Sequence, residues 1–222
     1  MIVIIDYGMG NTGSVKNMFN RIGIRAEVSS CPQIISKASG LVIPGVGSFD
    51  SGMRRLEEKG LVTLLNDLVI KEKVPVLGIC LGMQLLGNGS EEGGKEGLGW
   101  ISGKSVRFSF KNKNKQKLNV PHMGWNYIKP CSEDGLFKNN DCELRFYFVH
   151  SYYFVCDRKN DIHATCSYGH DFACAIRREN IYGAQFHPEK SHRNGMRILM
   201  AYASECLEES NLADSGIIQG YK

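Results

Sequence analysis

Residues 75–84 read PVLGICLGMQ, an apolar run that enters a Gly-x-Cys-x-Gly turn and continues with helical spacing. This is the layout of a nucleophile elbow, a sharp strand-to-helix turn that presents a reactive side chain, here with sulfur in place of oxygen. The end of a strand holds Cys80 rigidly, and the start of a helix favours a thiolate over a thiol. The spacing also fits an inert junction, because glycine is common there and cysteine is often buried. By itself, the turn leaves both interpretations open.

The segments around the elbow indicate the fold. Upstream, short β-branched runs alternate with stretches of helical spacing, which is typical of βαβ units and a parallel sheet. The expected strands there are 2–5, 24–28, 41–43 and 74–79, and the expected helices are 12–22 and 50–70. From about residue 103 the pattern changes to short strands separated by turn residues, at 106–110, 125–128, 144–155, 163–168, 172–176 and 181–186, before a last helix over 192–208. We therefore expect an α/β fold with an open, mostly parallel sheet flanked by helices and additional antiparallel strands in the C-terminal half. One domain covers 1–208, and 209–222 form a frayed polar tail.

Composition restricts the functional classes. The 222 residues are 42% hydrophobic and 23% charged, as in soluble globular proteins, and no apolar run approaches the roughly 20 residues of a membrane helix. No basic leader precedes the first strand, so a cytoplasmic protein is expected. The net charge of +4 is too small to predict nucleic-acid binding. The basic stretch 111–117 fits a solvated loop better than an anion site.

The eight cysteines form neither a C-x-x-C pair nor a closely spaced Cys/His quartet. We therefore expect no metal site and no disulfide framework. Cys80 is the cysteine whose local sequence favours reactivity.

A cysteine nucleophile needs a base, and a histidine oriented by a carboxylate supplies one. His187 ends an expected strand, and Glu189 follows two residues later, so in an extended segment both side chains point the same way. On its own, the His-Pro-Glu tripeptide also fits a turn that caps the following helix. Together with the elbow, it predicts a catalytic Cys80, His187 and Glu189.

These motifs resemble the class-I glutamine amidotransferases, which carry a cysteine elbow with histidine and glutamate two residues apart. The segment 44–47, PGVG, is similar to the glycine-rich oxyanion strand of that family, although it also fits an ordinary turn. The resemblance implies hydrolysis of L-glutamine without a cofactor or metal, and an oxyanion hole made by the N–H groups of Val46 and Leu81. It assigns substrate contacts to Gly47, Gln84, Glu92, Ser151 and Tyr152. Of these, Glu92 also fits a solvated acidic loop.

Three further segments, DYGMGN at 6–11, PHMGWN at 121–126 and FVHSY at 148–152, resemble one branch of the family. That branch is the glutaminase subunits of imidazole glycerol phosphate synthase in histidine biosynthesis. The resemblance implies a heterodimer with a (β/α)8-barrel cyclase, which converts PRFAR to imidazole glycerol phosphate and AICAR. Interface residues are then expected at Asn11, His122, Trp125 and Lys190, although Trp125 also fits a core aromatic. We expect weak activity without the partner, because the oxyanion hole forms only in the complex.

Three alternatives stay open at this point. A paralogous glutaminase would supply ammonia to another synthase, such as a surface-sugar amidotransferase. An elbow-bearing cysteine peptidase or stress protein would share the fold but not require Gln84 or the segment 44–47. A non-enzymatic binding module would carry an inert Cys80.

Overall fold

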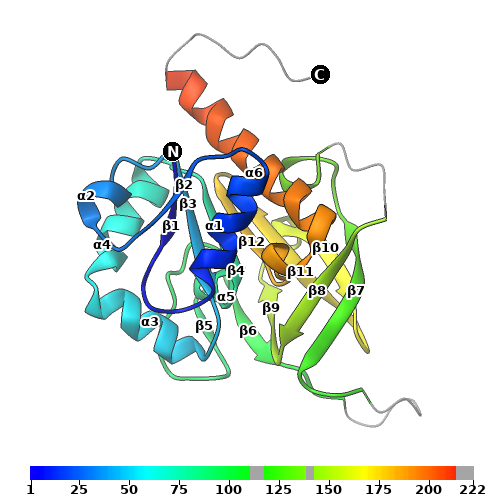
Figure 1. Cartoon of the computed structure of the whole chain (residues 1–222). Helices are drawn as coiled ribbons and strands as arrows, with labels where there is room; N and C mark the ends of the chain where they lie inside the picture. The colour runs from blue at the N-terminus through cyan, green and yellow to red at the C-terminus, as the bar shows by residue number, and fades with distance from the viewer. Residues whose placement is uncertain (111–117, 139–142, 214–222) are drawn as a thin grey trace.

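The computed structural model describes residues 1–110, 118–138 and 143–213, and within them twelve strands join in one sheet (Figure 1). One side of this sheet is parallel, in the spatial order β2 (Ala26–Ser29), β1 (Ile2–Ile5), β3 (Gly40–Gly45), β4 (Val76–Cys80) and β12 (Ile181–Ala184). Beyond β12 the sheet continues antiparallel through β11 (Asp171–Arg178), β10 (Ile162–Ser167), β7 (His122–Pro130) and β8 (Arg145–His150). Strand β9 (Tyr152–Cys156) branches from β11 and leads to β6 (Gly103–Arg107) and β5 (Gly89–Ser90). The predicted α/β class, with antiparallel strands in the C-terminal half, is confirmed.

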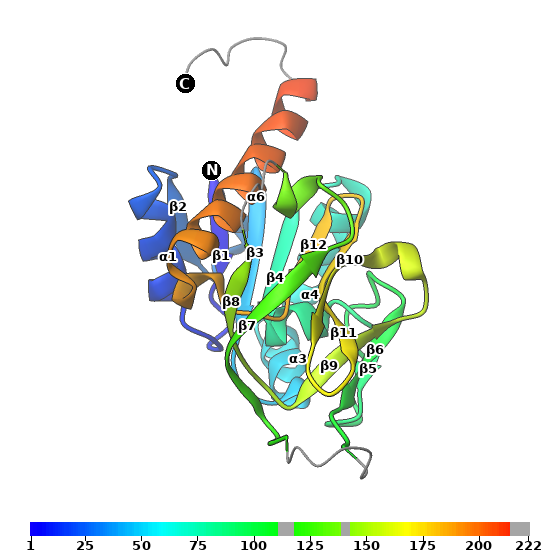
Figure 2. The same ribbon diagram turned by 90° about the vertical axis from the view of Figure 1, so that its right-hand side faces the viewer.

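Helices cover both faces of the parallel strands (Figure 2). Helices α1 (Thr12–Arg21) and α6 (His192–Ala213) lie on one face, and the other is covered by α2 (Pro32–Ile35), α3 (Phe49–Glu58), α4 (Leu61–Asn66) and α5 (Leu81–Leu85). Successive side chains of a strand point to opposite faces. In β1, Ile2 and Ile4 therefore enter the core under α1 and α6, whereas Val3 and Ile5 enter the core under α3 and α4. A strand covered on both faces must be apolar throughout, which explains the uninterrupted run at 2–5.

The single helix predicted over 50–70 is wrong. Helix α3 ends at Glu58, and α4 begins at Leu61 after Gly60, whose φ of +65° is left-handed. Glycine adopts this conformation without a steric penalty, so the chain turns there although its apolar spacing continues. A π-helical turn over Asp67–Lys71 then leads toward β4.

The structure also differs from prediction near residues 151 and 209. The strand expected over 144–155 is two strands, because the chain bends at Ser151 and passes from pairing with β7 to pairing with β6 and β11. Helix α6 continues to Ala213, so residues 209–213 are helical rather than part of a frayed tail. Residues 214–222 and the basic stretch 111–117 lie outside the described residues.

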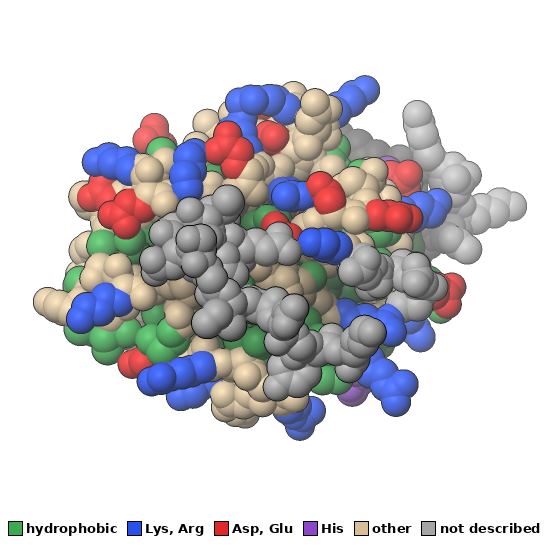
Figure 3. All heavy atoms as spheres, turned by 90° about the horizontal axis from the view of Figure 1, so that it is seen from above, with side chains coloured by type: hydrophobic (Ala, Val, Ile, Leu, Met, Phe, Trp, Pro, Cys, Tyr) green, Lys and Arg blue, Asp and Glu red, His purple; other side chains and the backbone are tan. Residues whose placement is uncertain are grey.

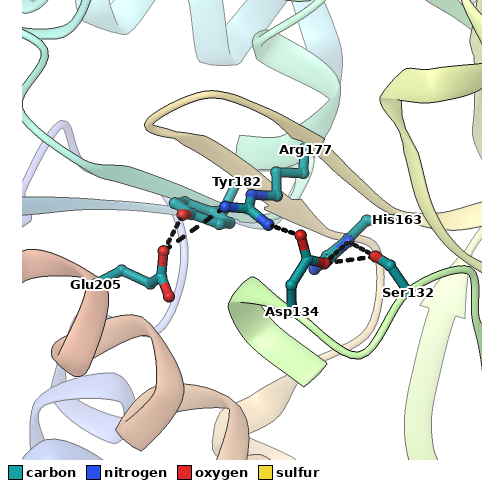
Figure 4. Close-up of polar contacts among 6 residues, drawn as sticks. All are labelled: Ser132, Asp134, His163, Arg177, Tyr182 and Glu205. Carbon is teal, nitrogen blue, oxygen red and sulfur yellow. Dashed lines mark hydrogen bonds and ion pairs between the residues drawn. The ribbon is translucent and has the colours of Figure 1, made fainter. Parts of the chain in front are cut away.

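A polar cluster ties α6 to the antiparallel strands (Figure 4). The guanidinium of Arg177 in β11 lies 5.3 Å from the ring centre of Tyr182 in β12 and pairs with Asp134. The Tyr182 hydroxyl donates a hydrogen bond of 2.6 Å to Glu205 of α6. His163 of β10 is buried beside Asp134. The cluster joins three strands to the helix through side chains, and we interpret it as structural.

On the face of the molecule that holds the N-terminus, basic and acidic side chains are interspersed rather than separated by sign (Figure 3). The visible part of this face therefore offers no continuous basic surface. None of the helices in the described ranges is both long enough and apolar enough to cross a membrane.

Candidate active site

Cys80 occupies a strained elbow at the end of β4. Its φ of +54° is unusual for a residue with a side chain, and α5 begins at the next residue. Such a conformation costs on the order of 1–3 kcal/mol and persists only where its surroundings impose it. One cause is close packing against β3, since a methyl group on Gly82 would collide with the carbonyl oxygen of Ile43. The elbow is thus held by the sheet, and the Cys80 side chain is nearly buried.

His187 and Glu189 make the contact that the sequence predicts. The imidazole Nδ1 lies 2.7 Å from Oε1 of Glu189, and both side chains are buried. The local conformation differs from the extended segment expected, because Pro188–Lys190 form a 3-10 turn. That turn brings the carboxylate back to the imidazole. The backbone N–H of His187 also donates to the carbonyl of Tyr147, 2.9 Å away, which fixes the ring relative to β8.

The environment of His187 favours its protonated form. Burial lowers the pKa of the imidazole, but the electrostatic influence of the neighbouring Cys80 and of Glu189 outweighs it and raises the pKa to about 10. With Nδ1 taken by Glu189, Nε2 is the ring atom left for chemistry, and it makes no hydrogen bond within the described residues. The ring can therefore hold a proton at Nε2 and deliver it to a leaving group.

Cys80 and His187 open into one cavity of about 260 Å³. The predicted oxyanion and substrate residues lie around it, namely Val46, Gly47, Leu81, Gln84, Glu92, Ser151 and Tyr152. The structure thus brings these residues together from five separate segments of the chain. The size of the cavity suits one small molecule rather than a polypeptide segment.

The two neighbouring acidic residues have different positions. Glu92 lines the cavity, and its Oε2 accepts a 2.7 Å hydrogen bond from the N–H of Phe49 at the start of α3. Glu91 instead accepts a 2.9 Å hydrogen bond from the N–H of Arg107 in β6. A helix N-terminus stabilises a carboxylate. Glu92 is exposed, but this hydrogen bond holds its carboxylate at the cavity wall.

Two segments could supply amide donors to the cavity. Leu81 is the first residue of α5, and the first N–H groups of a helix have no intrahelical acceptor. Val46 lies just after β3, with an exposed side chain, and is followed by Gly47 with a φ of +123°. Both residues line the cavity beside Cys80. Their role as oxyanion donors stays a prediction.

The structure buries the side chain of His122, and its expected contact with a partner stays a prediction. Its imidazole is only 3% exposed and lies between the aromatic rings of Phe148 and Tyr168. Strand β7 pairs with β8 there, and the ring points to the covered face of that pair.

The other three expected interface residues are accessible in different degrees. Trp125, on β7, is 39% exposed and stacks on His192, so it is not a core aromatic. Lys190 places its ammonium 5.6 Å from the ring centre of Tyr147. The exposed side chain of Asn11 caps α1 through the N–H of Ser14. Their contact with a partner stays a prediction.

Sequence reasoning missed Gln185 and His150. The Gln185 side chain is fully buried, and its Nε2 donates to the sulfur of Cys80 at 3.8 Å. His150 lines the cavity. The signal for Gln185 was its position two residues before His187 at the end of a strand, which in extended backbone places both side chains on one face.

Three buried histidines should make the fold sensitive to acid. Burial lowers the pKa values of His122, His150 and His163 to about 4, 3 and 4, below the value near 6.5 of an unfolded chain. Their contribution to stability is present above pH 6.5 and is lost as the pH falls toward 4. His187 does not oppose this trend, because its raised pKa affects stability only above about pH 6.5.

We expect the free energy of unfolding to fall by about 1.4 kcal/mol per pH unit for each buried neutral histidine between pH 6 and 4. Urea denaturation followed by circular dichroism at several pH values measures this slope. A His163→Gln variant should take up about one proton fewer on unfolding. Its slope should therefore be smaller by about 1.4 kcal/mol per pH unit. Equal stability at pH 6.5 and 4.5 would contradict the prediction.

Comparison with known proteins agrees with this geometry. The family model described as glutamine amidotransferase class-I matches residues 3–203. Solved structures show the same fold: a glutamine amidotransferase aligns with a TM-score of 0.71 at 16% identity over 93% of this chain and 99% of its own. A second, from Thermotoga maritima, aligns with a TM-score of 0.58 at 20% identity over 94% of this chain and 84% of its own.

Curated relatives narrow the family. The chain is 54% identical to imidazole glycerol phosphate synthase subunit HisH 2 of Methanococcus maripaludis, over 90% of this chain and 96% of the relative. It is 48% identical to subunit HisH 2 of Pseudomonas aeruginosa over 89% and 96%, and 46% identical to subunit HisH of Leptospira borgpetersenii over 92% and 100%. These comparisons do not favour the surface-sugar, peptidase, stress-protein or non-enzymatic alternatives. The chain belongs to the class-I glutamine amidotransferases and, within them, to the branch of imidazole glycerol phosphate synthase HisH subunits.

Proposed function

We propose that the chain hydrolyses L-glutamine to glutamate and ammonia, and hands the ammonia to a cyclase subunit that makes imidazole glycerol phosphate and AICAR from PRFAR. The observation that carries the proposal is the grouping in one cavity of an elbow cysteine and a histidine whose Nδ1 lies 2.7 Å from a buried carboxylate. The identity to HisH subunits supports the choice of pathway.

The first half-reaction forms a thioester. The thiolate of Cys80 attacks the side-chain carbonyl carbon of glutamine, and the new oxyanion accepts hydrogen bonds from the N–H groups of Val46 and Leu81. His187 donates the proton on Nε2 to the amide nitrogen, the C–N bond breaks, and ammonia leaves. Glu189 keeps the imidazole oriented and stabilises its positive charge.

The second half-reaction restores the enzyme. Neutral His187 takes a proton from water, and the resulting hydroxide attacks the γ-glutamyl thioester. The C–S bond breaks, glutamate is released, and the Cys80 thiolate and protonated His187 are regenerated. Apart from Glu189, which acts through His187, the protein groups in these steps belong to residues that line the cavity.

Substrate recognition is proposed for the remaining lining residues. The carboxylate of Glu92, held in place by the N–H of Phe49, suits the α-ammonium group of glutamine, since opposite charges at contact distance attract each other. Gln84 and the segment Ser151–Tyr152 lie on other walls of the cavity, with Gly47 next to the proposed oxyanion donor. Their peptide and amide groups suit the polar ends of the substrate.

A partner is proposed because ammonia in water at neutral pH is mostly protonated and not nucleophilic, so it must reach an acceptor site shielded from water. The outer face of β7 supports a docking role there. Met123, Trp125 and Tyr127 alternate along this strand and are 63%, 39% and 48% exposed. Aromatic side chains of this kind often dominate interface energies.

The test measures glutamate release and imidazole glycerol phosphate formation with the chain alone, and with purified cyclase plus PRFAR. We expect slow hydrolysis by the chain alone, at least about tenfold faster hydrolysis in the complex, and product formed from glutamine without added ammonia. Equal rates with and without the partner would contradict the proposed coupling. Absence of glutamate release under both conditions would contradict the glutaminase itself.

Matched variants test the docking face in the same assay. Trp125→Ala should raise the Kd for the cyclase at least about tenfold. Ile70→Ala removes a side chain of similar exposure, 42%, from the π-helical turn at the other end of β4, and should leave the Kd unchanged.

A further inference from the structure

We propose that Gln185 is a catalytic residue that donates a hydrogen bond to the Cys80 thiolate, and that the buried pair His122 and His150 is a positioning device that holds the Tyr152 carbonyl, from which the direction of the Gln185 amide follows. This inference deepens the proposed function and rests on it for the identity of the reaction. It is carried by a continuous series of hydrogen bonds from strand β7 to the nucleophile.

A backbone carbonyl decides which atoms of the series are donors and which are acceptors. Nδ1 of His150 lies 2.8 Å from the carbonyl oxygen of Tyr152, which can only accept, so Nδ1 carries the hydrogen. Burial lowers the pKa of His150 to about 3, so the ring is neutral near pH 7 and its Nε2 is an acceptor. Nδ1 of His122 lies 3.0 Å from that Nε2 and must donate to it.

The His122 ring is fixed from its other side. Burial lowers its pKa to about 4, so it is also neutral, and its Nε2 accepts from Nδ2 of Asn126 at 3.3 Å. The Asn126 amide is anchored by the carbonyl of Ser167, which accepts from Nδ2 at 3.0 Å. His122 and His150 are direct cross-strand partners in β7 and β8, so the sheet itself sets their separation.

Toward the cavity, the same carbonyl orients two amides in turn. Nε2 of Gln84 donates to the Tyr152 carbonyl and to Oε1 of Gln185, both at 3.1 Å. Both N–H bonds of Gln84 are thereby used, and its oxygen is left for another partner. Because Oε1 of Gln185 is occupied as an acceptor, its Nε2 faces Cys80.

The polarity of this series matters for catalysis. If the Gln185 amide were flipped, its NH₂ group would face the NH₂ group of Gln84 and its oxygen would face the sulfur. The first arrangement places two donors together, and the second repels a thiolate. With the observed direction, a buried donor aims at the atom that carries negative charge, where such hydrogen bonds are strongest.

The test follows the pH dependence of Cys80 alkylation by iodoacetamide in the full chain, with modification of the Cys80 peptide measured by mass spectrometry. This readout needs neither glutamine turnover nor the partner. Gln185→Glu keeps the shape but replaces the donor by an acceptor. We expect Cys80 alkylation at pH 7 to fall about tenfold and its half-maximal rate to move to higher pH by about one unit.

The positioning pair is tested by a conservative rescue. His150→Leu removes both ring nitrogens and should shift the alkylation profile in the same direction, whereas His150→Asn can still donate to the Tyr152 carbonyl and should restore most of the wild-type profile. His163→Leu is the matched control, a buried histidine in the polar cluster of Figure 4 that does not line the cavity. It should lower stability without moving the profile.

An unchanged alkylation profile in folded Gln185→Glu would overturn the assignment of Gln185. Equal profiles for His150→Leu and His150→Asn, or a shift in His163→Leu as large as that in His150→Leu, would overturn the positioning role. If the shifts appear but the wild-type complex releases no glutamate, the proposed function fails while the assignment of a donor to Cys80 stands.

Discussion

Replacing Cys80 with alanine should abolish glutamine-dependent synthesis, with a loss of at least about 10⁴-fold in kcat for glutamate release in the complex with the cyclase. The reason is chemical, because no other side chain in the cavity can form the thioester. Alanine and cysteine meet the same steric penalty at a φ of +54°, so the variant should retain the fold. Steady-state glutamate release and thermal unfolding measure the two effects separately.

Added ammonia and a second cysteine provide the controls. The Cys80→Ala complex should still make product from PRFAR when ammonia is supplied directly, since the proposed cyclase site is intact. Cys174→Ala removes a fully buried thiol from β11, outside the cavity, and should keep glutaminase activity. Undiminished glutamine-dependent product from Cys80→Ala would exclude the proposed mechanism.

Replacing His187 with asparagine should lower kcat by at least about 10³-fold, because the proton for the departing nitrogen and the base for the attacking water are lost together. The variant also removes the positive charge that faces the buried carboxylate of Glu189. An uncompensated buried charge is destabilising by several kcal/mol. A low activity could therefore come from either cause.

A double variant separates these causes. His187→Asn combined with Glu189→Gln removes the unpaired charge and should recover much of the lost thermal stability, while activity stays low. The single variant Glu189→Gln should keep the imidazole of His187 in place but lower its pKa. The alkaline limb of the pH–rate profile should therefore shift to lower pH. Recovery of activity in the double variant would contradict a catalytic role for His187.

Local patterns identified the segments of the fold well, because hydrophobic periodicity reports which faces of an element are covered. The apolar run of β1 and the elbow after β4 are examples, since both depend on a few neighbouring residues. Periodicity failed at Gly60 and Ser151, where the chain turns without interrupting the apolar pattern. It also gave the correct contact between His187 and Glu189 for an incorrect reason, because a 3-10 turn rather than a strand joins them.

The sequence by itself indicated Cys80, His187 and Glu189 as the proposed nucleophile, general base and carboxylate, because each lies in a short motif that can be recognised without knowledge of the fold. Only the tertiary structure decided that Gln185 touches Cys80, 105 residues away in the chain, since this requires β12 to lie beside β4. It also decided that His122 is buried against His150 rather than exposed, since this requires the register of β7 on β8. Strand partners far apart in sequence are chosen by the packing of the whole sheet, and no local pattern encodes that choice.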